Sequence, residues 1–227
     1  MEQRMTGILY GVSVGPGNPE LLTLQAVRLL RQCPVLAAPQ TASGQMLALD
    51  IARRALGAEL DGKTILPLQF AMSRDAAVLR ASHETAASAV RPFLDAGQDV
   101  AMLNLGDVSI YATFGYLQEI LQAQGYATAM AAGVPSFCAA AARLNQPLTG
   151  GMDAPLTIAP GTKVLMKTGR QLPALLDTLD AHGALSRSAL VCSCGLPDET
   201  IFPDLSTARP PQDGSKAGYF ATVLVKE

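Results

Sequence analysis

Three short glycine-containing turns hold the residues of this 227-residue chain that could do chemistry. Each turn follows an apolar, strand-like segment and precedes a helix-like one. Glycine lets the backbone approach a ligand closely, and open α/β sheets bind ligands beyond the carboxyl ends of their strands. Together the turns predict one ligand crevice, although each by itself could be only a tight turn or a helix cap. The turns are Gly11–Gly17 (GVSVGPG), Gly106–Tyr111 (GDVSIY) and Gly133–Ser136 (GVPS).

Asp107 is the one acidic side chain in these turns. A carboxylate directly after a buried strand can accept hydrogen bonds from an amine or hydroxyl of a ligand. It can equally cap the helix that follows. The residue types alone leave both roles open.

A fourth glycine segment, Gly57–Thr64 (GAELDGKT), matches the phosphate-loop pattern but has the wrong neighbours. A phosphate loop follows a strand and opens a helix, so that the amides of the helix N-terminus face the anion. This segment follows a helix-like stretch and precedes a strand-like one, and Glu59 and Asp61 would repel phosphates. It is interpreted as a helix–turn–strand connection. The first turn also fails the dinucleotide fingerprint, because its last glycine is replaced by Glu20.

The composition excludes several classes of function. A formal charge of −2 and an aromatic content of 5% do not favour a nucleic-acid groove. No segment approaches the roughly 20 unbroken apolar residues of a membrane span, and no signal peptide is evident, so we expect a cytoplasmic protein. We expect no metal site built from protein ligands, because the candidates are few and badly spaced. These are Cys33, Cys138, Cys192, Cys194, His83 and His182.

Strand-like and helix-like segments alternate through the first part of the chain, which predicts a mostly parallel, doubly wound α/β sheet. The strands are expected at Gly7–Val14, Pro34–Ala38, Lys63–Leu68, Val100–Leu105 and Tyr126–Ala131. The helices are expected at Glu20–Arg31, Gln45–Leu56, Ser73–Ala96, Tyr111–Gln124 and Ser136–Leu144.

A change of pattern near residue 146 predicts two domains, 1–146 and 147–227. The second should be a smaller α/β domain with a mixed sheet. Its strands are expected at Lys163–Met166, Ala189–Ser193, Thr200–Pro203 and Tyr219–Lys226, with a helix at Leu172–His182.

The same turns resemble the motifs of a known family, the tetrapyrrole (corrin and sirohaem) methyltransferases. The three resembling segments are Gly11–Ala26, Leu103–Phe114 and Gly133–Leu148, and KVLMKTG and CGLPDE fit later landmarks. Within the family the chain most resembles enzymes that methylate carbon 20 of precorrin-2 or cobalt-precorrin-2. It departs from the usual pattern at Asn18, Val108 and Pro135, where Asp, Pro and Thr are common.

This resemblance implies a cytoplasmic homodimer of cobalamin biosynthesis, with S-adenosylmethionine held between two α/β domains and a tetrapyrrole as the small-molecule substrate. Asp107 or Tyr111 could orient the substrate or accept its proton. Basic side chains for the substrate carboxylates are expected at Arg143, Lys167 and Arg170. The residues expected around the cofactor are Pro16, Leu105, Gly106, Asp107, Ile110, Pro135, Ser136, Met166, Lys167 and Cys194.

The resemblance leaves alternatives open. Another tetrapyrrole methyltransferase of the pathway, or a non-catalytic ligand-binding α/β protein, would share the same crevice. The sequence also does not specify whether the substrate already carries cobalt, because the metal would arrive with the ring.

Overall fold

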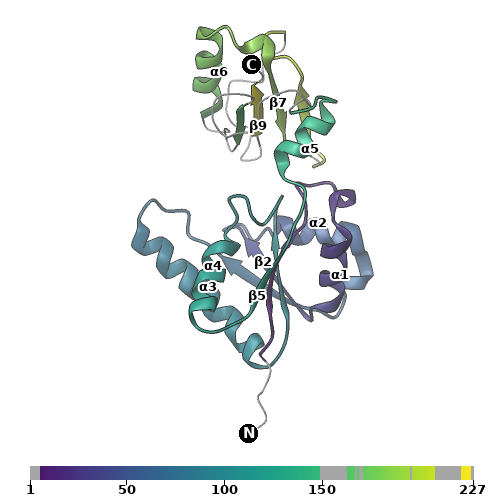
Figure 1. The fold of residues 1–227 in the computed structure, drawn as a ribbon, viewed down its shortest axis with the longest axis vertical. Coiled ribbons are helices and arrows are strands. Elements are labelled where there is room, and N and C mark those ends of the chain that lie inside the picture. Colours follow the sequence, from purple (N-terminus) through teal and green to yellow (C-terminus); the bar gives the residue numbers. More distant parts are fainter. Residues whose placement is uncertain are drawn as a thin grey trace. The chain divides into compact units, whose positions relative to one another are not determined.

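The chain divides into two compact units, Met1–Pro135 and Ser136–Glu227 (Figure 1). Helix α5 (Ser136–Arg143) belongs to the second unit and contacts strand β9 there, whereas the sequence analysis assigned this helix to the first domain. The computed structural model describes residues 6–148, 163–166, 168, 171–194, 196–207 and 221–225.

A five-stranded sheet forms the centre of the first unit, in the order β3-β2-β4-β1-β5. Every pair of neighbouring strands is parallel, which confirms the predicted parallel α/β architecture. The strands are β1 (Leu9–Ser13), β2 (Val35–Gln40), β3 (Thr64–Gln69), β4 (Val100–Asn104) and β5 (Thr128–Ala131).

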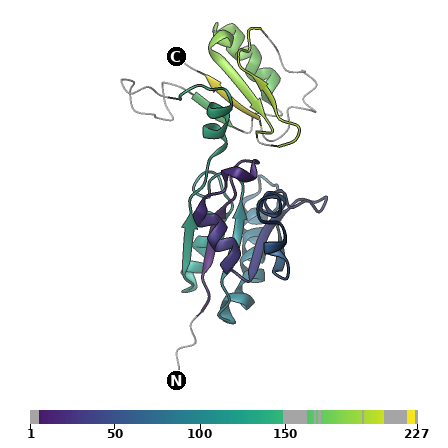
Figure 2. The same ribbon diagram turned by 90° about the vertical axis from the view of Figure 1, so that its right-hand side faces the viewer.

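Helices cover both faces of this sheet, as Figures 1 and 2 show. Side chains alternate along a strand, so Leu36 of β2 packs with the α1–α2 cluster while Ala37 packs with the α3–α4 cluster. Burial on both faces explains why the strands are continuous apolar runs. The helices are α1 (Leu24–Gln32) and α2 (Leu47–Leu56) on one face, and α3 (Ala76–Asp95) and α4 (Phe114–Ala123) on the other.

All four of these helices begin two to four residues later than predicted. Helix α1 starts at Leu24 because the Thr23 hydroxyl caps it, accepting the N–H of Ala26 at 3.1 Å. Helix α4 starts at Phe114 rather than Tyr111. The backbone of Tyr111 has a φ of 51°, in the left-handed region, which a right-handed helix cannot include. The segment between β4 and α4 is therefore a loop.

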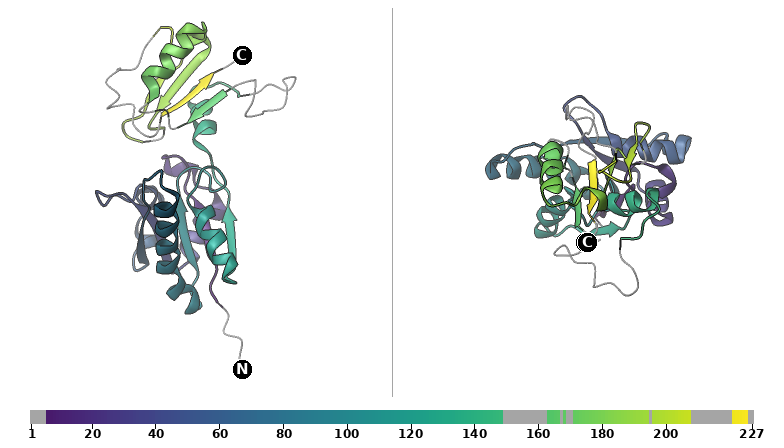
Figure 3. Two further views of the ribbon diagram at one scale, coloured as in Figure 1. Left: turned by 90° about the vertical axis from the view of Figure 1, so that its left-hand side faces the viewer. Right: turned by 90° about the horizontal axis from the view of Figure 1, so that it is seen from above.

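The second unit contains a four-stranded sheet in the order β6-β9-β7-β8. All of its described pairings are antiparallel, so the prediction of a mixed sheet is wrong. β6 and β7 do run in the same direction, as a strand–helix–strand unit requires, but β9 lies between them and runs opposite to both. Helix α6 (Leu172–Ala181) packs on this sheet through Leu176 (Figure 3). The strands are β6 (Lys163–Met166), β7 (Ser188–Cys192), β8 (Thr200–Phe202) and β9 (Ala221–Val225).

Within the described part of the chain, none of the helices has the length and apolarity needed to cross a membrane.

Strand β1 and helix α4 approach each other so closely that a side chain is excluded at Gly11. A Cβ there would lie 2.7 Å from the ring of Phe114, which is fully buried. We expect Gly11→Ala to lower the free energy of unfolding by about 1–3 kcal/mol, because overpacking forces ring or backbone to shift. Urea unfolding followed by circular dichroism measures this change.

The matched control is Gly115→Ala, one residue beyond Phe114 on the same helix, where a Cβ meets no atom within 4 Å. Alanine is a better helix former than glycine, so this variant should be stabilised by up to about 1 kcal/mol. A Gly11→Ala protein as stable as the wild type would contradict the close packing of β1 on α4.

Candidate active site

The three glycine turns lie side by side at the carboxyl edge of the first sheet. β1 is hydrogen-bonded to β4 on one side and to β5 on the other. In the parallel register Ser13 is paired with Asn104, and Val12 with Ala131, so the three strands end at the same level. The edge at which α/β sheets bind ligands thus carries all three predicted turns.

The first and second turns are joined through their backbones. The N–H of Gly106 donates to the carbonyl of Gly15 at 2.8 Å. Both glycines have left-handed φ values, 69° for Gly106 and 71° for Gly15. A residue with a side chain would be strained at either position. Pro16, which follows Gly15, is buried, and Leu105 is half-buried.

The carboxylate of Asp107 joins the second turn to the third. One oxygen accepts the N–H of Ser109 at 2.8 Å and also its hydroxyl, and the other accepts the N–H of Gly133 at 2.7 Å. Asp107 caps no helix, since α4 begins seven positions later at Phe114. Its carboxylate therefore holds the backbone of this edge in shape.

Burial by itself raises the pKa of Asp107, but hydrogen bonds from Gly133 and Ser109 outweigh burial and hold the pKa below its ordinary value of 3.8. The group is ionised at neutral pH. Because both oxygens accept protein donors, the carboxylate is poorly arranged to take a proton from a substrate.

Gly133 has no room for a side chain. A Cβ at this position would lie 2.3 Å from the Cβ of Ser13 and 2.7 Å from the carbonyl oxygen of Gly106. The third turn thus packs directly on the first two. It continues into Pro135, the last residue of the first unit, and Ser136, the first residue of α5, which are both half-buried.

Tyr111 is the exposed aromatic residue of the second motif, with 74% of its surface accessible. Its left-handed φ of 51° is unusual for a bulky residue, and such conformations concentrate at functional sites. Ile110 precedes it and closes a turn, its N–H donating to the carbonyl of Asp107 at 3.1 Å. The turn begun by Asp107 therefore presents a tyrosine ring to solvent.

The second unit holds the remaining predicted residues. Met166 ends strand β6 and pairs with Thr222 of β9. Lys167 and Arg170, expected near the cofactor and the substrate, lie outside the described residues. Thr168 lies between them in sequence and is buried, with 7% of its surface accessible, and its hydroxyl has no hydrogen-bond partner among the described residues. A buried hydroxyl without a partner is costly, so this oxygen fits a polar group of a ligand.

Arg143, a predicted substrate ligand, is bound to Glu199. Its Nε and one terminal nitrogen donate to the same carboxylate oxygen at 2.9 and 2.7 Å. The Arg143 side chain is 62% exposed, whereas that of Glu199 is only 11% exposed. This hydrogen bonding raises the pKa of Arg143 further above its ordinary value. The guanidinium is oriented by Glu199, and much of its charge is neutralised there.

Cys194, a predicted cofactor residue, contacts the same carboxylate. Burial, reinforced by the charge of Glu199 and a hydrogen bond to it, raises the pKa of the Cys194 thiol to about 12. The thiol is protonated at neutral pH and is no nucleophile. Glu199 thus connects two residues that the sequence analysis assigned separately, one to the cofactor and one to the substrate.

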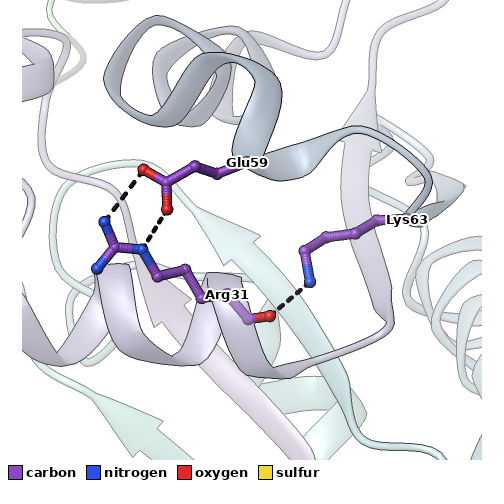
Figure 4. Close-up of polar contacts among 3 residues, drawn as sticks. All are labelled: Arg31, Glu59 and Lys63. Carbon is purple, nitrogen blue, oxygen red and sulfur yellow. Dashed lines mark hydrogen bonds and ion pairs between the residues drawn. The ribbon is translucent and has the colours of Figure 1, made fainter.

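The phosphate-loop look-alike forms the predicted helix–turn–strand connection between α2 and β3. Lys63, the residue that would bind phosphate, donates to the backbone carbonyls of Arg31 at 2.7 Å and Cys33 at 2.8 Å. Glu59 is paired with Arg31 beside it, as Figure 4 shows. Lys63 and Glu59 thus bind other parts of the protein, and the lysine ammonium is not directed at a phosphate.

The described residues include no cluster of three or more His, Cys, Asp or Glu side chains that could hold a metal ion.

Comparison with known proteins identifies the architecture. Residues 8–208 match the family described as Tetrapyrrole (Corrin/Porphyrin) Methylases. The chain belongs to this family.

Relatives of this tetrapyrrole methylase extend over nearly its whole length. It is 30% identical to a cobalt-precorrin-2 C(20)-methyltransferase of Salmonella typhimurium, over 98% of each chain. It is 28% identical to a precorrin-2 C(20)-methyltransferase of a Sinorhizobium species, over 96% of this chain and 95% of that one. The X-ray structure of a cobalt precorrin-4 methyltransferase has the same fold, with a TM-score of 0.71 and 20% sequence identity. The superposition covers 98% of this chain and 95% of that one.

Sequence reasoning missed three polar residues of the methylase. They are Ser13, which is fully buried in β1, Ser109, which hydrogen-bonds Asp107, and Glu199, which holds Arg143. A signal existed for Ser13, because a hydroxyl inside a strand that is buried on both faces must find partners there. Glu199 gave no such signal, since its partner is distant in sequence.

We expect Asp107→Asn to weaken binding of the methyl donor about tenfold and to lower the free energy of unfolding by about 1–3 kcal/mol. An amide has one acceptor oxygen and would turn its NH2 group toward a backbone N–H. Because the pKa of Asp107 in the folded protein is below 3.8, the ionised carboxylate stabilises the fold fully at neutral pH. This stabilisation is lost as the pH falls through that pKa and the carboxylate is protonated. The stability gap between the two proteins should therefore narrow in acid. Calorimetric titration and urea unfolding measure both effects.

Asp204→Asn is a matched control. Asp204 accepts the N–H of Ser206 at 2.8 Å and its hydroxyl at 2.6 Å, which repeats the turn formed by Asp107 and Ser109. It belongs to the second unit and makes no described bond to a strand-end turn. Donor binding should be unchanged in this variant. Equal affinities in both variants would show that the bond to Gly133 has no role in binding.

Proposed function

We propose that this tetrapyrrole methylase transfers the methyl group of S-adenosylmethionine to carbon 20 of precorrin-2 or cobalt-precorrin-2 in cobalamin biosynthesis, and releases S-adenosylhomocysteine. The observation that carries the proposal is the joining of three glycine turns at one sheet edge, in a chain whose full-length relatives bear C(20)-methyltransferase names. The similarity runs through both units, which favours this reaction over that of a ligand-binding protein without catalysis.

The described residues fit such a donor. The turns at Gly15, Gly106 and Gly133 pack closely on one another, and we propose that their backbone groups contact the ligand. The ionised Asp107 lies in the second turn and is hydrogen-bonded to the third, so its negative charge favours a cationic ligand at this edge of the sheet. In the second unit, the hydroxyl of Thr168, which has no partner in the described part of the chain, lies in the segment predicted to bind the cofactor. We propose that Pro16, Leu105, Ile110, Pro135 and Ser136 contribute from the turns, and that Met166, Lys167 and Cys194 contribute from the second unit.

The donor would supply an electrophilic methyl group, whose bond to sulfur breaks, with the electron pair going to sulfur, as the ring carbon bonds to it. The hydrogen of that carbon then leaves as a proton, which a base at the site or solvent accepts. The protein's part is orientation and exclusion of water, which can supply on the order of 7–11 kcal/mol. Asp107 acts in this scheme as a positioning residue, since its hydrogen bonds and low pKa make it a weak base. Tyr111, exposed on the same turn, is the better candidate for contact with the substrate.

Arg143, Lys167 and Arg170 remain the proposed partners of the substrate carboxylates. Arg143 is the one whose side chain is described. Its pairing with Glu199 fixes the direction of the guanidinium, and the negative carboxylate offsets its positive charge. An oriented guanidinium retains N–H groups that can bind a second carboxylate. Its contribution is therefore to the placement of the ring more than to overall affinity.

The experiment supplies purified protein with S-adenosylmethionine labelled in its methyl carbon and with precorrin-2, prepared with and without cobalt. We expect one labelled methyl group in the product, located at carbon 20 by nuclear magnetic resonance. Comparing the two preparations identifies the preferred form of the ring. Transfer to another carbon would contradict the C20 assignment. Failure to bind S-adenosylmethionine would contradict the proposed function as a whole.

We also propose that the protein works as a homodimer in the cytoplasm. The resemblance to the family supports both statements. Light scattering should give a mass of twice the 23.7 kDa of one chain.

A further inference from the structure

Ser13 connects all three strand ends through one oxygen atom. Ser13 is the last residue of strand β1, and its side chain has no exposed surface. The hydroxyl donates to the carbonyl of Ala131, the last residue of β5, at 2.7 Å. The same oxygen accepts the N–H of Val108, which directly follows Asp107, at 2.9 Å. The second and third turns are therefore held together at two points, by Asp107 to Gly133 and by Ser13.

We infer that Ser13 is a positioning residue for the methyl donor, acting through the backbone of Val108 to fix the turn that contains Asp107. This inference rests on the proposed function. Val108 is buried, with 3% of its surface accessible, so its N–H has no access to bulk water. Without the hydroxyl, both that N–H and the carbonyl of Ala131 would lose their described partner. Buried backbone groups are rarely left unpaired, so the turn should shift to find new partners.

The packing around Ser13 prevents a simple replacement by water. Gly133 lies so close that a Cβ built on it would be 2.3 Å from the Cβ and 3.1 Å from the Oγ of Ser13. Ser13→Ala removes a single oxygen atom, and the Gly133 backbone packs directly against the space that this atom fills. The turn itself must therefore move when the hydroxyl is lost.

Proline at position 108 gives a specific test of whether Ser13 acts through the N–H of Val108. Proline has no backbone N–H, so Val108→Pro removes the donor that Ser13 satisfies. Proline is also common at this position in the family, and we expect the backbone to accept it. If Ser13 acts through Val108, the substitution should relieve most of the effect of losing the hydroxyl. Only the carbonyl of Ala131 would then remain without its hydrogen bond.

The experiment measures the dissociation constant of S-adenosylmethionine by calorimetry, and KM and kcat by methyl transfer. We expect Ser13→Ala to raise Kd and KM for the donor about tenfold, equivalent to about 1.4 kcal/mol, with kcat at saturating donor changed by less than about twofold. The double variant Ser13→Ala/Val108→Pro should bind the donor within about threefold of the wild type. Val108→Pro alone is the reference for the double variant, because it lacks the same N–H while Ser13 keeps its hydroxyl.

Ser188→Ala is the matched control, since Ser188 is a buried serine of β7 in the second unit whose hydroxyl donates to the carbonyl of Ala184 at 2.7 Å. We expect it to lower the melting temperature while leaving donor binding unchanged. If Ser13→Ala does not fold, Ser13→Cys keeps a single γ atom, although a larger one, with a far weaker donor and acceptor, and it should show the same loss of affinity.

Wild-type affinity in the folded Ser13 variant would overturn the inference. A loss of affinity that Val108→Pro does not relieve would also overturn it, because the path through Val108 would be excluded. A wild-type protein that binds no S-adenosylmethionine would overturn the proposed function and this inference with it. Unchanged binding by the Ser13 variant overturns this inference alone.

Discussion

The hydrogen bond from the N–H of Gly133 to the carboxylate of Asp107 joins turns that follow two different strands of the first sheet. It forms because β4 and β5 flank β1 in parallel register and end at the same level. It also requires glycine at 133, where any Cβ would collide with Ser13. The shape of the whole ligand edge depends on this contact, since it fixes the backbone on both sides of the first turn.

The same contact decides what Asp107 can do. A carboxylate that accepts donors at both oxygens stays ionised in a buried position, because the hydrogen bonds favour the charged form more than burial disfavours it. The negative charge then contributes to the electrostatic field of the site, but the carboxylate is not free to accept a proton. Methyl transfer from a sulfonium asks little more of a protein than orientation, so a rigid backbone edge suits the reaction better than a set of acid and base side chains.

The second unit shows the same use of polar pairs to hold residues that were predicted for the site. The nearly buried Glu199 carboxylate fixes Arg143 of α5 and contacts Cys194, which follows β7. The ion pair orients the guanidinium of Arg143, whose positive charge is offset by the carboxylate. An exposed arginine held in this way can recognise a carboxylate by geometry, which suits a substrate whose acidic groups are distributed around a ring.

The sequence by itself determined the alternation of strands and helices, the parallel first sheet and the glycine turns, because these depend on local residue patterns and on burial. It also rejected the phosphate loop, since that motif depends on the order of its neighbouring elements. Tertiary structure decided the antiparallel second sheet, in which β9 inserts between β6 and β7. It also decided the partners of Ser13 and Arg143 and the bond from Gly133 to Asp107. Those bonds join residues that are far apart in the chain, and no local pattern specifies which distant backbone or carboxylate a side chain will meet.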